Sequence, residues 1–447
     1  MRKLSAFAII MAILFIFSCG DDNPVDPSGG IKVMLSPDSA IVNHSDSIQF
    51  TAGVYNTTNT AVKWYVYDIE NGDLDSIGSI DSTGWYKAPD TTITLSTGLA
   101  DSVIIWVVSQ EDTSKKASSK ITIVDPNNIY VDDGENASDE TGTGTIAQPY
   151  RTITKGLSIA ETGQTVRVFP GTYSDGETFP ITPLFGRSVK GVYPESTATV
   201  RAPAGENISN AAFLIQNDLI SIESIGIVGT GGSGVGINFA GSSDTTQMEL
   251  YNCKIDSCYI GAIQSTNIFI LEFKANEVSN CDYGLIVDYE NQALEDNSLF
   301  INDTTIFTDC ITAIDIKSEI EKFYFENSII NTAATGISLK DGEDTFLYLR
   351  NSQVINIDSI GIMIDSVAYA NLGDSISSPG YSYGNNTFSL VDEDGYFIYN
   401  SCEIVIRAGG NTWYASDSAY IDTHIYDNEE SGNSSGEVVF HPYTLEP

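Results

Sequence analysis

The sequence is poor in positive charge. Its 447 residues include 21 Lys and Arg against 60 Asp and Glu, a formal net charge of −39 at pH 7. Such a chain repels phosphate backbones and anionic lipid headgroups, so the composition argues against nucleic acid and anionic membrane surfaces as partners. The acidic balance suits solubility, divalent cations or a cationic environment, and the composition alone does not choose among these.

Long hydrophobic runs are equally scarce. The only one, LSAFAIIMAILFIFS at residues 4–18, follows Arg2 and Lys3 and ends at Cys19. The small residue before this cysteine resembles the lipobox of bacterial lipoproteins, which implies a signal peptide over residues 1–19 and lipidation of Cys19. An uncleaved anchor and a secretory signal with an incidental cysteine are the alternatives. Residues 20–30, rich in Pro, Gly and Asp, are typical of a flexible tether.

Without a second hydrophobic span, we expect the remainder of the chain to lie outside the cytoplasm. The lipobox resemblance implies a cell-envelope protein whose lipid anchor holds it to the outer membrane. Acidic residues directly after Cys19 resemble the surface-export signals of some lipoproteins, so surface exposure is one alternative.

Cysteine is absent from residues 31–125, so no disulfide can join strands within that segment. SIQFTAGV, AVKWYVYD, SVIIWVVS and SKITIVD alternate apolar and polar residues between clusters of turn formers, which predicts a β-sandwich. These phrases, together with Trp64 and GSIDSTGWYKAP at residues 78–89, resemble the bacterial Ig-like domains. The resemblance implies a spacer that lifts a larger module from the cell surface.

The sequence pattern changes after Asp125 and Pro126, and residues 127–447 are predicted to form a second domain. The phrases YVDDG, PYRTITKGL and GQTVRVFPGTY within residues 129–173 resemble the domain of unknown function that opens many pectin-lyase-like β-helix proteins. This implies a right-handed parallel β-helix. Ile153, Leu157 and Ala160 share one helical face, which predicts a capping helix near residues 151–162 that covers the open end of the coil.

A repeat supports the same architecture. Six small residues precede apolar strands at steps of 25, 23, 29, 23 and 25 residues, a period typical of solenoids; they are Gly236, Gly261, Gly284, Ala313, Gly336 and Gly361. An asparagine recurs within the period. Because equal positions of successive turns stack about 4.8 Å apart, the sequence predicts a structural amide ladder formed by Asn252, Asn276, Asn327 and Asn351.

Three of the six cysteines occupy one position of this repeat, in the phrases DSCYIGAI, SNCDYGLI and TDCITAID. We interpret Cys258, Cys281 and Cys310 as an interior ladder of small, buried side chains. A disulfide and a metal site are the alternatives, but a linear column does not converge as metal ligands must, and parallel side chains suit disulfides poorly. The redox state of Cys253 and Cys402 is left open.

Histidine is scarce as well. His44, His424 and His441 lie outside the repeats, and no acidic phrase resembles the motifs of the sugar hydrolases, which need paired carboxylates. A lyase would need a Lys or Arg base, with Ca²⁺ held by acids.

Four residues past the aligned small residue, one outward column contains Asp288, Lys317, Lys340 and Asp365, with Asp315 beside Lys317.

This column supports two interpretations. In a lyase, Lys317 or Lys340 would be the catalytic base, and Asp288 and Asp315 would hold Ca²⁺ beside a uronate. In the structural interpretation, the same residues form a ladder of ion pairs between turns.

A second candidate surface lies later in the chain, where aromatic residues either contact glycans or fill the core: Tyr381, Tyr383, Tyr396, Tyr399, Trp413 and Tyr414. Phe388 and Trp413 are predicted to point inward.

The sequence therefore predicts an all-β protein, a right-handed parallel β-helix solenoid preceded by an Ig-like β-sandwich. The favoured function is a non-catalytic surface lipoprotein that presents the β-helix to a glycan or a protein partner. The alternative is a Ca²⁺-dependent polysaccharide lyase that acts on an acidic polysaccharide. We expect a monomer that contacts the membrane through its lipid anchor.

Overall fold

The computed structural model describes residues 29–66, 69–70, 77–90, 93–95, 98–100, 102–193, 197–241, 247–266, 268, 270–289, 297–340, 345–365, 368–373, 384–427 and 436–446. The signal-peptide and Cys19 predictions, and those for Tyr381 and Tyr383, lie outside these residues. The chain divides into two compact units, the first ending at Asp125 and the second beginning at Pro126.

The described residues of the first unit form short strands and no helix. They are β1 (Lys32–Ser36), β2 (Ser39–Asn43), β3 (Ser47–Gln49), β4 (Thr51–Tyr55), β5 (Val62–Val66), β6 (Ile69–Glu70), β7 (Ser79–Ile80), β8 (Trp85–Lys87), β9 (Ile93–Leu95), β10 (Gly98–Ala100), β11 (Ser102–Ser109) and β12 (Lys116–Val124). Five of them form a sheet in the order β2-β12-β11-β5-β6, in which only β2 and β12 run parallel.

Apolar and polar residues alternate along these strands, so the apolar side chains point into a core within the first unit. Val103, Ile105 and Val107 of β11 are fully buried, and they pack in one cluster with Trp64 and Tyr86. Tyr86 donates its hydroxyl to the carbonyl of Ile77 at 2.8 Å, so its polar atom is satisfied within the core.

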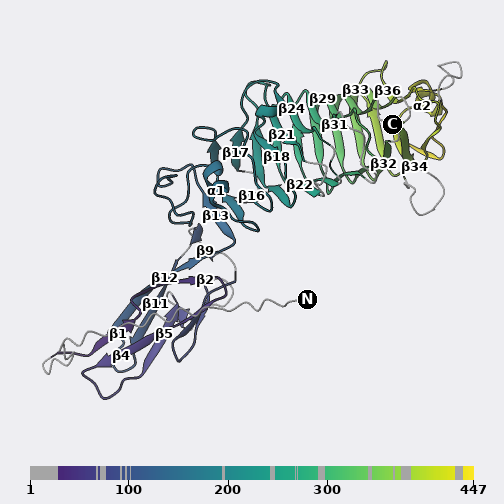
Figure 1. Ribbon diagram of the computed structural model, residues 1–447. Helices are drawn as coiled ribbons and strands as arrows, with labels where there is room; N and C mark the ends of the chain where they lie inside the picture. Colours follow the sequence, from purple (N-terminus) through teal and green to yellow (C-terminus); the bar gives the residue numbers. More distant parts are fainter. Residues whose placement is uncertain are drawn as a thin grey trace, which may run out of the picture. The chain divides into compact units, whose positions relative to one another are not determined.

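The second unit is a parallel β-helix whose strands stack along one axis (Figure 1). One stack is a 12-stranded sheet, here called sheet E, in the order β13 (Asn128–Val131), β14 (Thr165–Val168), β16 (Ser188–Gly191), β19 (Ile220–Glu223), β22 (Gln247–Tyr251), β25 (Ile270–Lys274), β28 (Ser298–Asn302), β30 (Lys322–Glu326), β32 (Phe346–Arg350), β34 (Tyr369–Gly373), β37 (Ile406–Ala408) and β40 (Val438–Val439). The prediction of a parallel β-helix is confirmed.

The facing 17-stranded sheet, sheet F, receives two strands or one long bent strand from most turns. Its strands are β15 (Gly171–Tyr173), β17 (Ala198–Arg201), β18 (Phe213–Ile215), β20 (Ile225–Val228), β21 (Val235–Phe239), β23 (Lys254–Asp256), β24 (Ile260–Gln264), β26 (Glu277–Ser279), β27 (Tyr283–Val287), β29 (Ile306–Ile316), β31 (Ile329–Leu339), β33 (Gln353–Ile364), β35 (Thr387–Leu390), β36 (Tyr396–Asn400), β38 (Asn411–Tyr414), β39 (Ile425–Tyr426) and β41 (Tyr443–Glu446).

A short helix lies between β13 and β14, the first two strands of sheet E, in the segment where the apolar spacing predicts one. Helix α1 spans Ile153–Ile159, shorter than the predicted 151–162 because Ala160 leaves helical geometry at ψ 144°. The predicted face is buried at Ile153, Leu157 and Ala160. Thr152 caps the first turn by accepting from the amide of Lys155, and the Glu177 carboxylate accepts from the amides of Ile153 and Thr154.

The aligned small residues stack directly on one another. A methyl group built at Gly261 would lie 2.6 Å from the carbonyl oxygen of Gly284, and one at Gly284 would lie 2.5 Å from that of Ala313. An added methyl group at either glycine would therefore clash with the backbone of the next turn. The residues one and three positions later point inward and are 0–1% exposed: Leu285, Val287, Ile314, Ile316, Ile337, Leu339, Ile362 and Ile364.

The described part of the second unit contains two more helical segments. The 3₁₀ turn η1 spans Ile208–Asn210 and is capped by Asn207, whose side chain accepts from the amide of Ser209. Helix α2 spans Ser418–Thr423 and is capped by Asp417. Ile208 of η1 packs on an outward apolar cluster that contains Val235, Ile260, Ile263 and Ile286. The segment that carries η1 therefore covers part of the outer face of sheet F.

Candidate functional site

The predicted outward column is present on sheet F. The amides of Lys317, Lys340 and Asp365 each donate to a carbonyl of the preceding turn (Val287, Ile316 and Leu339), which places Asp288, Lys317, Lys340 and Asp365 one above the other. Asp288 and Asp365 are exposed, whereas the two lysines are half-buried. Backbone hydrogen bonds fix the spacing of these side chains because each one sits on a stacked strand.

A second outward column, next to the first, is more buried than the sequence suggests. The residues two positions past the aligned Gly or Ala point outward, yet Ile286, Asp315 and Ser338 are only 4%, 3% and 1% exposed. The segment that carries η1 packs over the first of these turns, and the ammonium of Lys317 lies 3.4 Å from Oδ2 of Asp315 on the second. Asp315 is therefore a buried carboxylate and not an exposed member of a surface ladder.

A trough of about 570 Å³ opens on this face, across β24, β27 and β29. Ile260, Ile263 and Ile286 line it with apolar side chains. Tyr259 and Tyr283 contribute its aromatic lining, with their rings edge to face and their centroids 5.8 Å apart. The outward column contributes Ser265, Asp288 and Lys317 to the lining, and Ile208 and Tyr289 complete it.

Lys317 connects the aromatic and the charged parts of the trough. Its Nζ lies 3.4 Å from Oδ2 of Asp315 and 3.8 Å from Oδ2 of Asp288, and it stands 5.6 Å from the centroid of the Tyr283 ring. The other carboxylate oxygen of Asp315, Oδ1, is buried and has no hydrogen-bond partner. A cation, an aromatic ring and a carboxylate with a free lone pair thus meet in one place.

The calcium prediction assigned Asp288 and Asp315 as ligands. In the structure, the Lys317 ammonium lies between these two carboxylates. Among the described residues, no group of three or more His, Cys, Asp or Glu side chains is arranged to hold a metal ion. Ca²⁺ usually takes six to eight oxygens. A Ca²⁺ at this place would have to displace the lysine and draw most of its ligands from water or a bound uronate.

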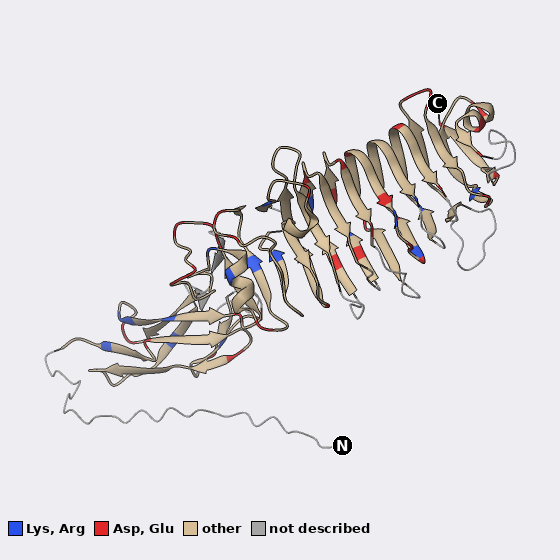
Figure 2. Ribbon diagram, turned by 45° about the horizontal axis from the view of Figure 1, so that its top comes forward, with Lys and Arg blue, Asp and Glu red and all other residues tan. Residues whose placement is uncertain are grey.

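Acidic residues are not confined to the trough. Figure 2 shows Asp and Glu spread along the strand ends and turns of the β-helix. Most ion pairs of sheet E join neighbouring turns, such as Lys190 with Glu223 at 2.5 Å and Arg350 with Glu326 at 2.6 Å. Asp315 is unusual against this background because its carboxylate is buried.

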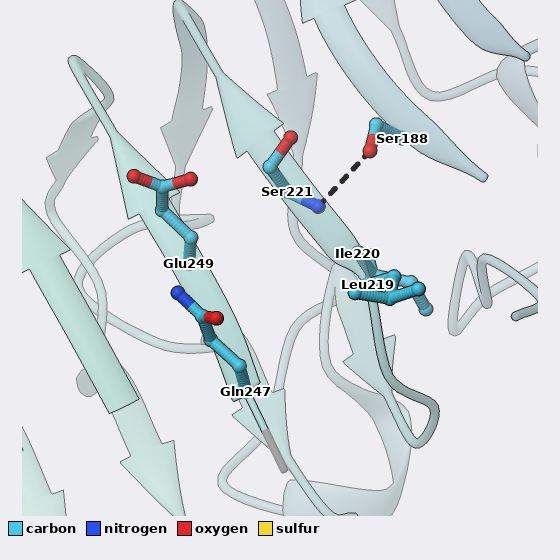
Figure 3. Close-up of a pocket in the computed structure, with 6 residues that line it drawn as sticks. All are labelled: Ser188, Leu219, Ile220, Ser221, Gln247 and Glu249. Atoms are coloured by element: carbon cyan, nitrogen blue, oxygen red, sulfur yellow. Dashed lines mark hydrogen bonds between the residues drawn. The ribbon is translucent and has the colours of Figure 1, made fainter. Parts of the chain in front are cut away.

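A second depression lies on the outer face of sheet E. It has a volume of about 250 Å³ and is lined by Ser188, Leu219, Ile220, Ser221, Gln247 and Glu249. Figure 3 shows the Ser221 amide donating to the Ser188 hydroxyl, while Gln247 and Glu249 extend from the next strand. Gln247 in turn donates to Glu272. The depression is small and has no aromatic side chain, so the trough on sheet F is the better candidate site.

The three repeated cysteines lie in one buried column of free thiols. Cys258, Cys281 and Cys310 are 1%, 2% and 4% exposed. Each thiol donates to the carbonyl two residues earlier, at 3.6, 3.2 and 3.5 Å. Burial raises the pKa of Cys310 to about 12, and contact with the Cys258 thiol together with burial raises the pKa of Cys281. Such thiols are poor nucleophiles at neutral pH.

The four predicted ladder asparagines fall into two columns and not one. Asn252, Asn327 and Asn351 occupy a corner with φ between 48° and 52°, which asparagine tolerates better than most residues. Asn276 is one position further on and is 1% exposed. Its Oδ1 accepts from the amide of Cys253, and its Nδ2 donates to the carbonyl of Leu250.

The prediction failed at Asn276 because Ala275 takes the corner in that turn, with φ 52°. The buried column continues through side chains of different types, namely Cys253, Asn276, Thr305, Ser328, Ser352, Asn386 and Asn411. Asn386 accepts from the amide of Ser352, and Asn411 from that of Asn386, both at 3.0 Å. The amide ladder is therefore real but occupies the next position of the repeat.

The late aromatic residues divide between core and surface. Phe388 and Trp413 are fully buried and stack at 4.6 Å, which confirms their predicted inward orientation. Tyr399 stacks on Tyr426 at 4.3 Å on the outer side, and Tyr414 is 46% exposed. Tyr259 and Tyr283 were not predicted as site residues, although both lie within the repeated cysteine-containing segments, close to the aligned glycines.

An aromatic ladder that was not predicted from the sequence lies on the outer face of sheet E. Phe300, Tyr324 and Tyr348 stack at 4.9 Å on three successive turns. Because the rings lie face to face, they present edges to the solvent and not flat faces. The histidines are not part of either candidate surface; His424 is 8% exposed, with its ring nitrogens beside the carbonyls of Tyr420 and Glu393.

Comparison with protein families gives one result. A family model described as protein of unknown function (DUF1565) matches residues 136–417, which covers α1, the trough and most of the β-helix. No match is found among curated proteins.

Proposed function

Because the chain belongs to the DUF1565 family, whose description assigns no activity, we propose from the geometry of the trough that this protein binds a glycan without modifying it. The observation that carries the proposal is the composition of the trough, in which the tyrosine pair Tyr259 and Tyr283 adjoins the charged pair Asp288 and Lys317.

A sugar ring has the matching chemistry. Its C–H groups form apolar faces that pack on aromatic rings, and its hydroxyls both donate and accept hydrogen bonds. Asp288 can accept from one hydroxyl, while the ammonium of Lys317 can donate to a neighbouring oxygen. The volume of about 570 Å³ is within the range of small-molecule sites. The trough is part of a stacked sheet, so little ordering is needed on binding.

The proposal also includes the location of the protein in the cell and its attachment to the membrane. We place the protein in the cell envelope, anchored by a lipid on Cys19, with the first unit as an Ig-like stalk for the β-helix. The signal-like run before Cys19 supports the anchor, and the all-β first unit, with its own core around Trp64, supports the stalk. No helix among the described residues is long and apolar enough to cross a membrane.

The anchor is tested by labelling with a fatty-acid analogue. The Cys19→Ala variant should lose the label and leave the membrane fraction, or accumulate unprocessed, while the Cys402→Ala variant should keep the label. Label retained on Cys19→Ala would refute the lipobox interpretation.

Glycan binding is tested with the mature chain on an array of polysaccharides, followed by calorimetry on any hit. Tyr283→Ala removes the ring beside Lys317 and should weaken binding by up to about tenfold, since aromatic contacts contribute about 0.5–1.5 kcal/mol beyond the area they bury. Tyr251→Ala is the matched control, because Tyr251 is 40% exposed on sheet E, away from the trough. Equal affinity of the two variants, or no bound polysaccharide, would contradict the proposal.

A further inference from the structure

Two buried polar atoms without partners lie beside the trough, on successive turns. They are Oδ1 of Asp315 and Oγ of Ser338, in residues that are 3% and 1% exposed. The two residues are direct neighbours in the register of β29 and β31, and Asp315 follows Ile286 of the trough in the same column. Buried polar groups are almost always hydrogen-bonded, so two free ones in adjacent turns need an explanation.

The chemistry of these atoms points to a hydrogen-bonding ligand. An ionised carboxylate only accepts hydrogen bonds, whereas a hydroxyl both donates and accepts. The next outward column contributes Thr312 and Thr335 on the same two turns, and both are half-buried. The outer face of sheet F therefore changes from apolar at Ile263 and Ile286 to polar at Asp315 and Ser338 as it continues from the trough.

The ionised groups along this face are not arranged for an anionic ligand. Asp288 and Asp315 flank Lys317, and its ammonium is already paired with both carboxylates. The chain as a whole has a formal charge of −39. A uronate placed beside Asp315 would bring like charges together in a partly desolvated site, which is unfavourable.

We infer that the ligand of this face is an uncharged, hydroxyl-rich glycan chain that extends from the tyrosine pair to Asp315 and Ser338, and that polyuronates are excluded. This inference rests on the proposed glycan binding and specifies the class of glycan. A sugar hydroxyl donates to Oδ1 of Asp315, and a second sugar oxygen pairs with the hydroxyl of Ser338. Lys317 is paired with Oδ2 of Asp315, so Oδ1 is the oxygen left for the ligand.

The inference is tested by equilibrium binding of the mature chain to two sets of oligosaccharides. One set consists of neutral oligomers of glucose, mannose or galactose, and the other of oligogalacturonate. The native chain should bind a neutral oligomer and exclude oligogalacturonate, and the exclusion should weaken as ionic strength rises. Longer neutral oligomers should bind more tightly than the monosaccharide.

Variants then test the two unpartnered atoms. Asp315→Asn keeps the shape but removes the charge; it should weaken neutral binding about tenfold and relax the exclusion of oligogalacturonate. Ser338→Ala should weaken neutral binding about threefold to tenfold without changing that exclusion. Asp365→Asn is the matched control, because it removes one charge from an exposed residue of the same face and should leave both affinities unchanged. A thermal melt of each variant shows that it is folded.

The outcomes separate this inference from the proposed function. If oligogalacturonate binds better than every neutral oligomer and Tyr283→Ala still weakens it, glycan binding stands and the inference is overturned. If Asp315→Asn and Asp365→Asn have the same effect on both ligand sets, the buried carboxylate does not select the ligand, and the inference is again overturned. If no oligosaccharide binds at all, the proposed function itself fails.

Discussion

The ammonium of Lys317 lies 3.4 Å from a carboxylate oxygen of Asp315, and the two side chains differ sharply in exposure, 36% against 4%. An ion pair with one buried member differs from the exposed pairs between turns of the β-helix, such as Lys254 and Glu277 of sheet F, whose side chains are 55% and 45% exposed. Exposed pairs contribute little to stability, whereas a buried carboxylate depends on its counter-ion.

The first prediction concerns that dependence. Lys317→Ala should lower the free energy of unfolding by about 1–3 kcal/mol, less than the 3–5 kcal/mol for a fully buried pair because the lysine is partly solvated. This differs from the expectation for a surface column, in which the same change would leave the melting temperature almost unchanged. Denaturant titration of the purified variant measures the difference.

Lys340 is the natural control for Lys317. It occupies the same column one turn later, but Ser338 takes the place of Asp315 beside it. Lys340→Ala should therefore change the free energy of unfolding by no more than about 0.5 kcal/mol. An equal and small loss for both lysine variants would show that the pair with Asp315 adds no stability.

A second prediction separates the two asparagine columns. Asn276→Ala removes the acceptor of the Cys253 amide and a donor to Leu250, both buried, and should cost about 2–4 kcal/mol. Asn252→Ala affects a half-buried corner residue whose side chain donates to Ser224, and should cost about 1 kcal/mol. If the two substitutions cost the same, the buried column is not the stabilising amide ladder.

The sequence contained enough information for the β-helix but not for its exact columns. Strand alternation and the recurring small residues at Gly261, Gly284 and Gly336 determine which side chains face inward, because parallel stacking repeats each position. The columns at the corners are less constrained, since different residues tolerate positive φ. In one turn Ala275 occupies the corner that asparagine occupies elsewhere, so the residue after it, Asn276, was assigned to the corner column although it belongs to the next one.

The trough itself was only partly predictable. The repeat places Asp288 and Lys317 in one column by counting alone. The burial of Asp315 depends on long neighbours such as Lys317, and the enclosure of Ile286 depends on a segment at η1 that packs back onto the sheet. No periodicity in the repeats specifies such a tertiary contact. Tyr259 and Tyr283 could have been noticed, because both accompany the repeated cysteines.

The corner occupied by Ala275 provides a third prediction. Its φ of 52° is disfavoured for alanine, and Asn252, Asn327 and Asn351 hold the equivalent place in other turns. Ala275→Asn should raise the free energy of unfolding by about 0.5–1 kcal/mol by relieving this conformational cost. Ala313→Asn, at a buried position of the close-packed glycine column, is the control and should destabilise the protein. A loss of stability in Ala275→Asn would contradict the assigned corner.

The fourth prediction concerns the glycine column. A Cβ at Gly284 would lie 2.5 Å from the carbonyl oxygen of Ala313 and 2.7 Å from the ring of Phe307. Gly284→Ala should therefore cost about 1–3 kcal/mol through overpacking, and Gly284→Arg should prevent folding. Gly205→Ala is an informative comparison because nothing lies within 4 Å of its Cβ position, so only its φ of 109° opposes the substitution. Circular dichroism melts of the three variants check the order.

The last prediction tests the thiol column by counting reactive cysteines. In a Cys19→Ser chain, Cys253, Cys258, Cys281, Cys310 and Cys402 remain, and all five are buried and free. Burial raises the pKa of Cys253 and of Cys310 to about 12, so at pH 8 these thiols are almost entirely protonated in the folded state. A chromogenic disulfide reagent should therefore react slowly with the native protein and rapidly with all five thiols in guanidinium without reductant.

Cys281→Ser should reduce the number of reactive thiols in the unfolded chain to four. The substitution should cost only about 1–2 kcal/mol of stability, because the hydroxyl can still donate to the carbonyl of Ser279. Fewer than five thiols in the unfolded, unreduced Cys19→Ser chain would mean that a disulfide links two of them, and the packed column would then be the wrong account of the repeated cysteines.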